Sequence, residues 1–165
     1  MSIVLIGGGS RSGKSRFALE MARQRGSRLA FVATAQAFDG EMRERIARHR
    51  AERDAAFVTI EEPVHLAAVL GQHREFDAMV VDCLTLWVSN LMLSDREIPA
   101  DELLEAARAS PAEVIFVTNE TGCGIVPENA LARRFRDVAG TLNQQVAAAA
   151  DRVYWMAFGI PLQVK

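Results

Sequence analysis

The sequence predicts an α/β fold, with a mostly parallel central sheet flanked by helices on both faces. Two observations along the chain predict it: short apolar runs alternate with helical patterns from end to end, and a glycine-rich loop joins the first strand to the first helix. The chain has 165 residues, of which 50% are hydrophobic, which is enough for one compact core. Neither an internal repeat nor a low-complexity linker divides it. We therefore expect one domain over residues 1–165.

Strands are expected where short apolar runs are bounded by turn residues. They are Ser2–Ile6, Leu29–Ala33, Phe57–Ile60, Ala78–Val81, Val114–Thr118, Val153–Met156 and Ile160–Val164. The last should be an edge strand, because Pro161 cannot donate to a ladder. Strands that alternate with helices predict a parallel sheet.

Helices are expected where apolar residues recur every three or four positions. They are Arg16–Arg25, Gly40–Arg53, Val64–His73, Leu84–Leu93, Asp101–Ala109 and Ala130–Ala149. Asp39 fits as an N-cap and Pro63 as a first-turn residue. In the last helix, one stripe should be core; it consists of Leu131, Phe135, Val138, Leu142 and Val146.

The loop after the first strand is the most informative motif. It matches G-x-x-x-x-G-K-S, the phosphate-binding P-loop, with Gly8, Gly9, Ser10, Arg11, Ser12, Gly13, Lys14 and Ser15. Backbone N–H groups of such a loop converge on phosphate oxygens, Lys14 reaches the β- and γ-phosphates, and Ser15 binds Mg²⁺. The flanking strand and helix favour this interpretation over a glycine-rich turn without a ligand. We therefore expect a P-loop NTPase (RecA-like) fold that binds ATP or GTP at the carboxyl ends of its strands.

An apolar strand that ends in a carboxylate is typical of the Walker-B arrangement. Met79–Asp82 has this form, and beside a P-loop it places Asp82 near the Mg²⁺ that Ser15 binds. Thr85 either approaches the same region or only caps its own helix.

Two further groups of residues leave alternatives open. His49 shares one helical face with Met42, Ile46 and Arg53, so it is either a semi-buried structural histidine or a nucleophile that attacks phosphorus. The arginines of the last helix form either a solvated basic face or a phosphate contact; they are Arg133, Arg134 and Arg136.

Charge and cysteine content exclude several classes of protein. A net charge of −2 gives no reason to expect binding to nucleic acid or to a membrane. Cys83 and Cys123 are too few for a disulfide scaffold and suit a reducing compartment. The chain opens directly on a strand, without a leader or a run long enough to span a membrane, so we expect a cytoplasmic protein.

Five motifs in order resemble those of one family over nearly the whole chain. They are G-G-G-S-R-S-G-K-S-R at residues 7–16, A-T-A-Q at 33–36, E-M-R-E-R-I-A-R-H-R at 41–50, V-D-C-L-T-L-W-V-S-N-L at 81–91 and V-T-N-E-T-G-C-G-I-V-P-E-N-A-L-A-R-R-F-R-D-V-A-G-T-L-N-Q-Q-V-A at 117–147. The chain resembles the bifunctional adenosylcobinamide kinase/adenosylcobinamide-phosphate guanylyltransferases of cobalamin biosynthesis. This resemblance implies phosphorylation of adenosylcobinamide by ATP or GTP, and then GMP transfer from GTP to adenosylcobinamide phosphate.

The resemblance also implies roles for individual residues. His49 matches the histidine that carries GMP, which selects the nucleophile from the two alternatives above. The remaining matches are to nucleotide contacts or positions near the guanylyl site: Thr34, Ala35, Gln36, Arg53 and Glu61. Glu61, proposed to recognise guanine, has a plain alternative as a surface carboxylate. Asp82 stands where some relatives have Glu, and Arg48-His49 where some have two histidines; the first difference preserves a carboxylate for Mg²⁺.

Oligomeric state and rival functions complete the expectations. The resemblance implies a homotrimer, for which Trp87 is either a contact or a core residue. The rival functions are a P-loop small-molecule kinase without guanylyl transfer and a non-enzymatic nucleotide-gated module.

Overall fold

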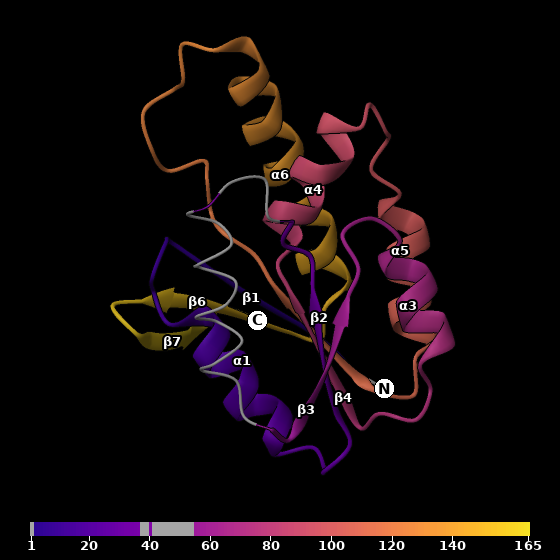
Figure 1. Ribbon diagram of the computed structural model, residues 1–165. Coiled ribbons are helices and arrows are strands. Elements are labelled where there is room, and N and C mark those ends of the chain that lie inside the picture. Colours follow the sequence, from indigo (N-terminus) through magenta and orange to yellow (C-terminus); the bar gives the residue numbers. More distant parts are fainter. Residues whose placement is uncertain (1, 37–39, 41–54) are drawn as a thin grey trace.

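A seven-stranded sheet forms the centre of the protein in the computed structural model, which describes residues 2–36, 40 and 55–165 (Figure 1). The strand order is β3-β2-β4-β5-β1-β6-β7. The strands are β1 (Ile3–Gly8), β2 (Leu29–Ala33), β3 (Phe57–Glu61), β4 (Ala78–Asp82), β5 (Glu113–Val117), β6 (Arg152–Ala157) and β7 (Ile160–Gln163). All pairings are parallel except β6 with β7, which are antiparallel. The expected parallel α/β sheet, with the Pro161 strand at its edge, is confirmed.

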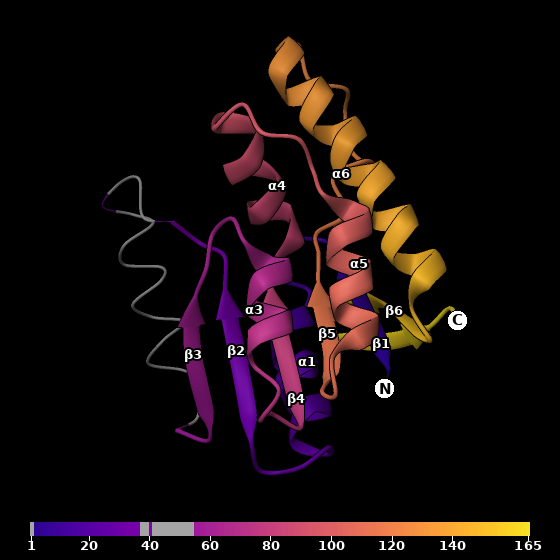
Figure 2. The same ribbon diagram turned by 90° about the vertical axis from the view of Figure 1, so that its right-hand side faces the viewer.

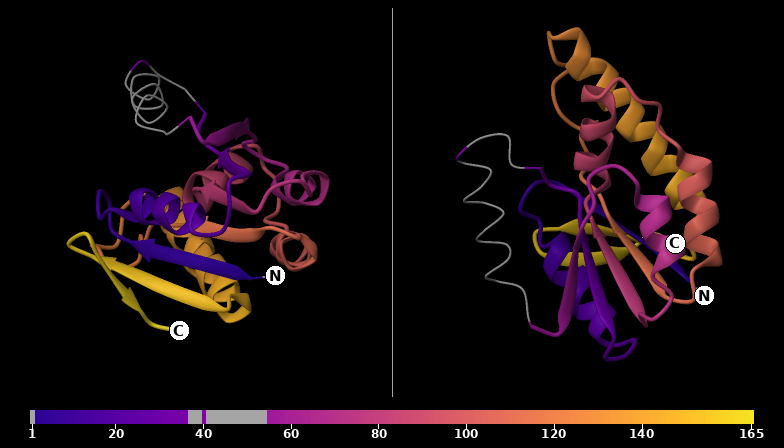
Figure 3. Two further views of the ribbon diagram at one scale, coloured as in Figure 1. Left: turned by 90° about the horizontal axis from the view of Figure 1, so that it is seen from below. Right: turned by 45° about the vertical axis from the view of Figure 1, so that its right-hand side comes forward.

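Helices cover both faces of this sheet. They are α1 (Lys14–Arg23), α3 (Leu66–Gln72), α4 (Leu84–Leu93), α5 (Ala100–Ala109) and α6 (Ala130–Ala149). On one face α1 packs against the sheet through Ala18, Met21 and Ala22. On the other face, α3, α4, α5 and α6 share a larger core (Figures 2 and 3). The expected helix over residues 40–53, with His49 and Arg53, lies outside the described residues except for Gly40.

Helix α6 extends beyond the sheet, so the expectation that its whole apolar stripe is core is wrong at the first residue. Leu142 and Val146 are buried and Phe135 and Val138 are partly buried, but Leu131 is 52% exposed. A helix of this length, 20 residues, spans about 30 Å, whereas strands of five or six residues span only about 17–20 Å. The first turns of α6 therefore project past the carboxyl ends of the strands (Figure 2).

Two local expectations are settled by packing. Trp87 is fully buried in α4, and its Nε1 donates to the carbonyl of Val64 at 2.7 Å, so it is a core residue. Pro63 is not in the first turn of a helix, because α3 begins at Leu66. The Glu62 carboxylate accepts from the backbone N–H of Val64 and from the next N–H, which holds this segment in a turn before the helix.

The described part of the chain contains no helix that is both long and apolar enough to cross a bilayer.

Candidate nucleotide site

The P-loop lies at the carboxyl end of the central strand β1. Gly8 ends that strand with φ 149°, and Gly13 precedes α1 with φ 91°. A Cβ atom on Gly8 would lie 2.9 Å from the carbonyl oxygen of Met156 in β6, so the loop packs directly on a neighbouring backbone. The first turn of α1 reads Lys-Ser-Arg-Phe, and its N-terminus therefore presents backbone N–H groups and positive charge together. This arrangement is suited to bind the phosphates of a nucleotide.

The side-chain ammonium of Lys14 binds the P-loop. Its Nζ donates to the carbonyl of Gly9 at 2.5 Å and lies 3.5 Å from the Ser12 hydroxyl. The residue is only 7% exposed. Burial lowers the pKa of Lys14, and the negative charge of Asp82 partly opposes that shift. The ammonium thus lies within the loop, close to where phosphates would bind.

The structure brings Ser15 and Asp82 together across the sheet. The Ser15 Oγ donates to Asp82 Oδ2 at 2.5 Å, although the two residues are 67 positions apart in sequence. A hydroxyl and a carboxylate oxygen are donors that suit Mg²⁺, which takes only one or two protein ligands when it also binds nucleotide phosphates. Among the described residues, no group of three or more His, Cys, Asp or Glu side chains forms a denser metal site. The pair therefore fits Mg²⁺ that travels with a nucleotide.

Thr34 supports the backbone that follows Asp82. Its buried hydroxyl donates to the carbonyl of Cys83 and accepts from the Cys83 N–H, both at 2.8 Å. Asn90 of α4 donates to the carbonyl of Thr34 at 2.8 Å. Burial, together with the charge of Asp82, raises the pKa of the Cys83 thiol to about 12, so this thiol stays neutral. Thr34 therefore positions Asp82, and its predicted contact with nucleotide stays a prediction.

A second polar network lies at the carboxyl end of β5. Thr85 does not act only as a local cap, since its Oγ1 accepts from the backbone N–H of Asn119 at 2.7 Å. The Thr118 hydroxyl donates to Asn143 Oδ1 at 2.8 Å, and Asn143 Nδ2 lies 3.4 Å from the carbonyl of Asn119. The sequence analysis did not single out Asn90 and Asn143. The signal that could have found them is an amide side chain on the core-facing side of an expected helix.

The other predicted positions lie in the P-loop or at the carboxyl ends of β2 and β3. Gly9, Ser10 and Arg11 are exposed on the P-loop, and the partly buried Ala35 and Gln36 follow β2. Glu61 is exposed at the end of β3, where it pairs in register with Ala33.

Two of the three arginines of α6 hold the preceding loop. Arg133 donates to the carbonyls of Pro127 and Glu128, and Arg136 donates to that of Gly122. Arg133 is exposed and Arg136 is partly buried, and neither is merely solvated, because their guanidinium groups bind backbone oxygens of the loop between β5 and α6.

Fold and site together define a P-loop nucleotide-binding protein. In agreement, the VirB11 ATPase of the Brucella suis type IV secretion system is similar in fold, with a TM-score of 0.52 and 13% identity over 99% of this chain and 47% of that one. The family model for cobinamide kinase / cobinamide phosphate guanyltransferase matches residues 4–164. The bifunctional adenosylcobalamin biosynthesis protein CobP of Pseudomonas aeruginosa is 47% identical over 98% of this chain and 96% of its own. The corresponding CobU of Escherichia coli is 38% identical over 99% of each chain. The chain belongs to the cobinamide kinase / cobinamide phosphate guanyltransferase family.

Proposed function

We propose that this protein phosphorylates the hydroxyl group of adenosylcobinamide with ATP or GTP, and then transfers GMP from GTP to adenosylcobinamide phosphate. The products of the second reaction are adenosylcobinamide-GDP and pyrophosphate. The observation that carries the proposal is the assembled P-loop, with Ser15 in contact with Asp82, in a chain that matches the family from residue 4 to residue 164. Free Cys83 and Cys123 suit the reducing cytoplasm in which we place these reactions.

In the kinase reaction the chain's own residues position and neutralise the triphosphate. The P-loop amides and the N-terminus of α1 bind phosphate oxygens, and Lys14 offsets the charge of the β- and γ-phosphates. Ser15 and Asp82 are the residues that would hold Mg²⁺, which supplies further positive charge at those phosphates. Thr34 keeps Asp82 in place through its two hydrogen bonds with Cys83.

In the guanylyl reaction we assign the nucleophile to His49. Its support is the resemblance of residues 41–50 to the segment that carries GMP in the family. A ring nitrogen of His49 forms a bond to the α-phosphorus of GTP as the bond to the α–β bridging oxygen breaks, and pyrophosphate leaves with the electron pair. An oxygen of the corrinoid phosphate then attacks the same phosphorus, and the P–N bond breaks to restore the imidazole.

The test is covalent labelling with GTP that carries the label on its α-phosphate. The wild-type protein should retain label after denaturation in alkali, where a phosphoramidate survives, whereas His49→Ala should retain none. His73→Ala is the matched control, because His73 pairs with Glu75 at the surface, and it should label as the wild type does. Label on His49→Ala contradicts the assignment; an unlabelled wild type that still phosphorylates adenosylcobinamide identifies a kinase without guanylyl transfer.

We also propose that the protein assembles as a homotrimer through the β6–β7 hairpin. Large apolar side chains gather there: Trp155, Phe158, Ile160 and Leu162 are all at least 36% exposed. Apolar side chains gathered on a surface in this way are typical of an interaction site. Light scattering should give three times the chain mass of 18.1 kDa, and Ile160→Glu should lower that value; a wild-type mass of one chain contradicts the proposal.

A further inference from the structure

The end of β5 occupies the space between the two halves of the nucleotide site. In the sheet order, β5 lies between β1, which leads into the P-loop, and β4, which ends in Asp82. Its last residue, Val117, is paired with Ile6 on one side and with Asp82 on the other. The residues that follow Val117 therefore leave the sheet between the strand that leads into the P-loop and the strand that ends in Asp82.

Hydrogen bonds continue past the end of β5 and bind this segment to the P-loop itself. The Thr118 N–H donates to the carbonyl of Ile6 at 3.0 Å, and the Glu120 N–H donates to that of Gly8 at 3.1 Å. Asn119 lies between these two bonds. Its backbone is therefore fixed beside the first glycine of the P-loop.

The alternation of side chains along a strand decides which face Asn119 occupies. Val117 packs in the core on the α1 face of the sheet. Thr118 is on the opposite face, where its hydroxyl bonds with Asn143 of α6 and lies 3.4 Å from that of Thr85 in α4. Because successive residues alternate, the Asn119 side chain is on the α1 face, the one that carries Lys14 and Ser15.

The network around Asn119 holds its backbone and not its side chain. Thr85 accepts from the Asn119 N–H, and Asn143 reaches its carbonyl. The hydrogen bonds of Asn119 within the described part of the chain involve only these backbone groups. A carboxamide has two N–H donors, which suit phosphate oxygens, and it adds no charge of its own.

We propose that Asn119 is a catalytic residue of the kinase reaction, which donates a hydrogen bond to an oxygen of the transferred γ-phosphoryl group. Thr85 and Asn143 are its positioning residues. This inference rests on the proposed kinase function. In that step the substrate hydroxyl oxygen forms a bond to the γ-phosphorus while the bond to the β–γ bridging oxygen breaks; the diphosphate leaves with the electron pair, and the hydroxyl proton passes to water.

The two reactions of the protein should depend on Asn119 to different degrees. Phosphoryl transfer changes the charge on the γ-phosphoryl oxygens, so a donor at that position acts on the transition state. Guanylyl transfer breaks the bond between the α- and β-phosphates, and the γ-phosphate is remote from that bond. There the same contact contributes only to binding, which GTP at saturating concentration compensates.

The experiment measures both reactions in the full chain with Asn119→Ala. The kinase kcat should fall about 100-fold with the nucleotide KM within about threefold, as when one transition-state donor is lost. The rate of labelling by α-labelled GTP at saturation should stay within about threefold of the wild type. Asn119→Asp should be slower still in the kinase reaction, because a carboxylate repels phosphate. An unchanged kinase kcat, or an equal fall in both reactions, overturns the inference.

A second variant tests the positioning role. Thr85→Val keeps the side-chain shape but removes the acceptor for the Asn119 N–H, so the kinase kcat should fall about tenfold with little change in KM. Thr141→Val is the matched control, since that hydroxyl donates only to Asp137 of its own helix. In the double variant with Asn119→Ala, Thr85→Val should add no further loss; independent, additive losses contradict the positioning role. A wild-type protein that shows neither activity refutes the proposed function itself.

Discussion

At the residue scale, the P-loop depends on Gly8, because the surrounding backbone leaves no room for a side chain at this position. Gly8 has φ 149°, in the region that disfavours side chains. A Cβ there would lie 2.9 Å from the carbonyl oxygen and 3.1 Å from the Cβ of Met156. Gly9 belongs to the same loop, but a Cβ on it meets no described atom within 4 Å. The motif requires glycine at position 8 and leaves position 9 open, and the packing of Gly8 against β6 gives the physical reason.

Gly8→Ala should therefore destabilise the protein, whereas Gly9→Ala should not. We expect Gly8→Ala to lower the free energy of unfolding by about 2 kcal/mol, because it introduces both backbone strain and a contact with a β-strand that cannot move aside. Gly9→Ala should change it by less than about 0.5 kcal/mol. Urea unfolding measures both values, and equal losses in the two variants contradict the argument.

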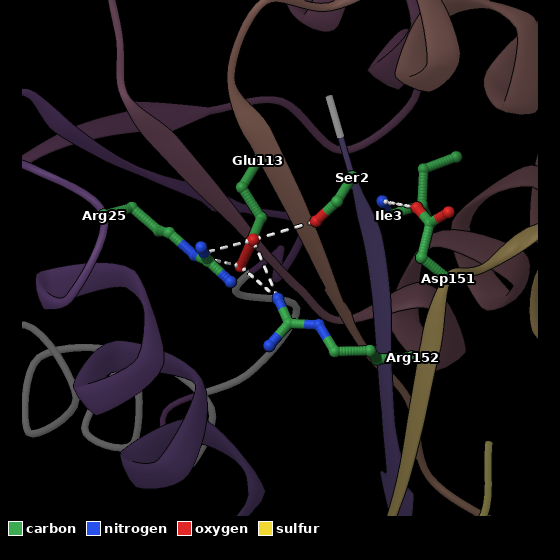
Figure 4. Close-up of polar contacts among 6 residues, drawn as sticks. All are labelled: Ser2, Ile3, Arg25, Glu113, Asp151 and Arg152. Atoms are coloured by element: carbon green, nitrogen blue, oxygen red, sulfur yellow. Dashed lines mark hydrogen bonds and ion pairs between the residues drawn. The ribbon is translucent and has the colours of Figure 1, made fainter.

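At the element scale, a buried carboxylate joins four elements at the amino edge of the sheet, opposite the nucleotide site (Figure 4). Glu113, at the start of β5, has a side chain that is only 6% exposed. It accepts from Ser2 at 2.8 Å, from Arg25 Nε at 2.9 Å and from Arg152 Nη2 at 2.8 Å. Beside it, the Ile3 N–H donates to Asp151 at 2.8 Å. The chain before β1, the segment after α1 and the start of β6 are thus held to β5.

Glu113→Gln should weaken the fold and leave the chemistry unchanged. The amide keeps the shape of the side chain but removes the charge that pairs with the partly buried Arg152 and the more exposed Arg25, which should cost about 2 kcal/mol of unfolding free energy. Kinase activity at low temperature should stay within about twofold, because the network is at the other edge of the sheet. Glu105→Gln, on the exposed side of α5, serves as control and should change stability by less than about 0.5 kcal/mol. A similar small change in Glu113→Gln would show that the network adds nothing.

At the scale of the whole molecule, the strand order gathers the residues to which we assign a function. Strands β1, β5 and β4 are adjacent in the sheet but distant in sequence, and their carboxyl ends carry the P-loop, Asn119 and Asp82. A ligand bound at this edge would contact several elements of the same cooperative fold at once. Occupancy of the site should therefore stabilise the entire domain.

A nucleotide with Mg²⁺ should raise the melting temperature in a metal-dependent manner. At a GTP concentration about 100 times Kd, the stabilisation is about 2.7 kcal/mol, which corresponds to a shift of about 5–10 °C for a domain of this size. EDTA should remove part of the shift, and Asp82→Asn should make the remaining shift insensitive to EDTA. Guanosine provides the control, since it lacks the phosphates; an equal shift with guanosine would mean that the P-loop does not bind the nucleotide.

The secondary structure could be predicted closely, because it depends on local patterns. The expected strand Ala78–Val81 is observed as Ala78–Asp82, and the expected helices Leu84–Leu93 and Ala130–Ala149 have the predicted bounds. The start of α3 was less predictable: Pro63 suggested a first turn, but the Glu62 carboxylate binds the backbone that follows it and delays the helix to Leu66.

By itself, the sequence determined the P-loop, the alternation of strands and helices, and the family, because spacing and periodicity are properties of neighbouring residues. Only the tertiary structure decided what depends on strand order and packing. It placed Asp82 against Ser15, joined Thr34 to Cys83 and buried Trp87 in the core. It also separated the two faces of the sheet at the end of β5, so that Val117 packs on the α1 side while Thr118 bonds with Asn143 of α6. The physical reason is that hydrogen bonds between distant residues form only after the sheet has brought their strands together.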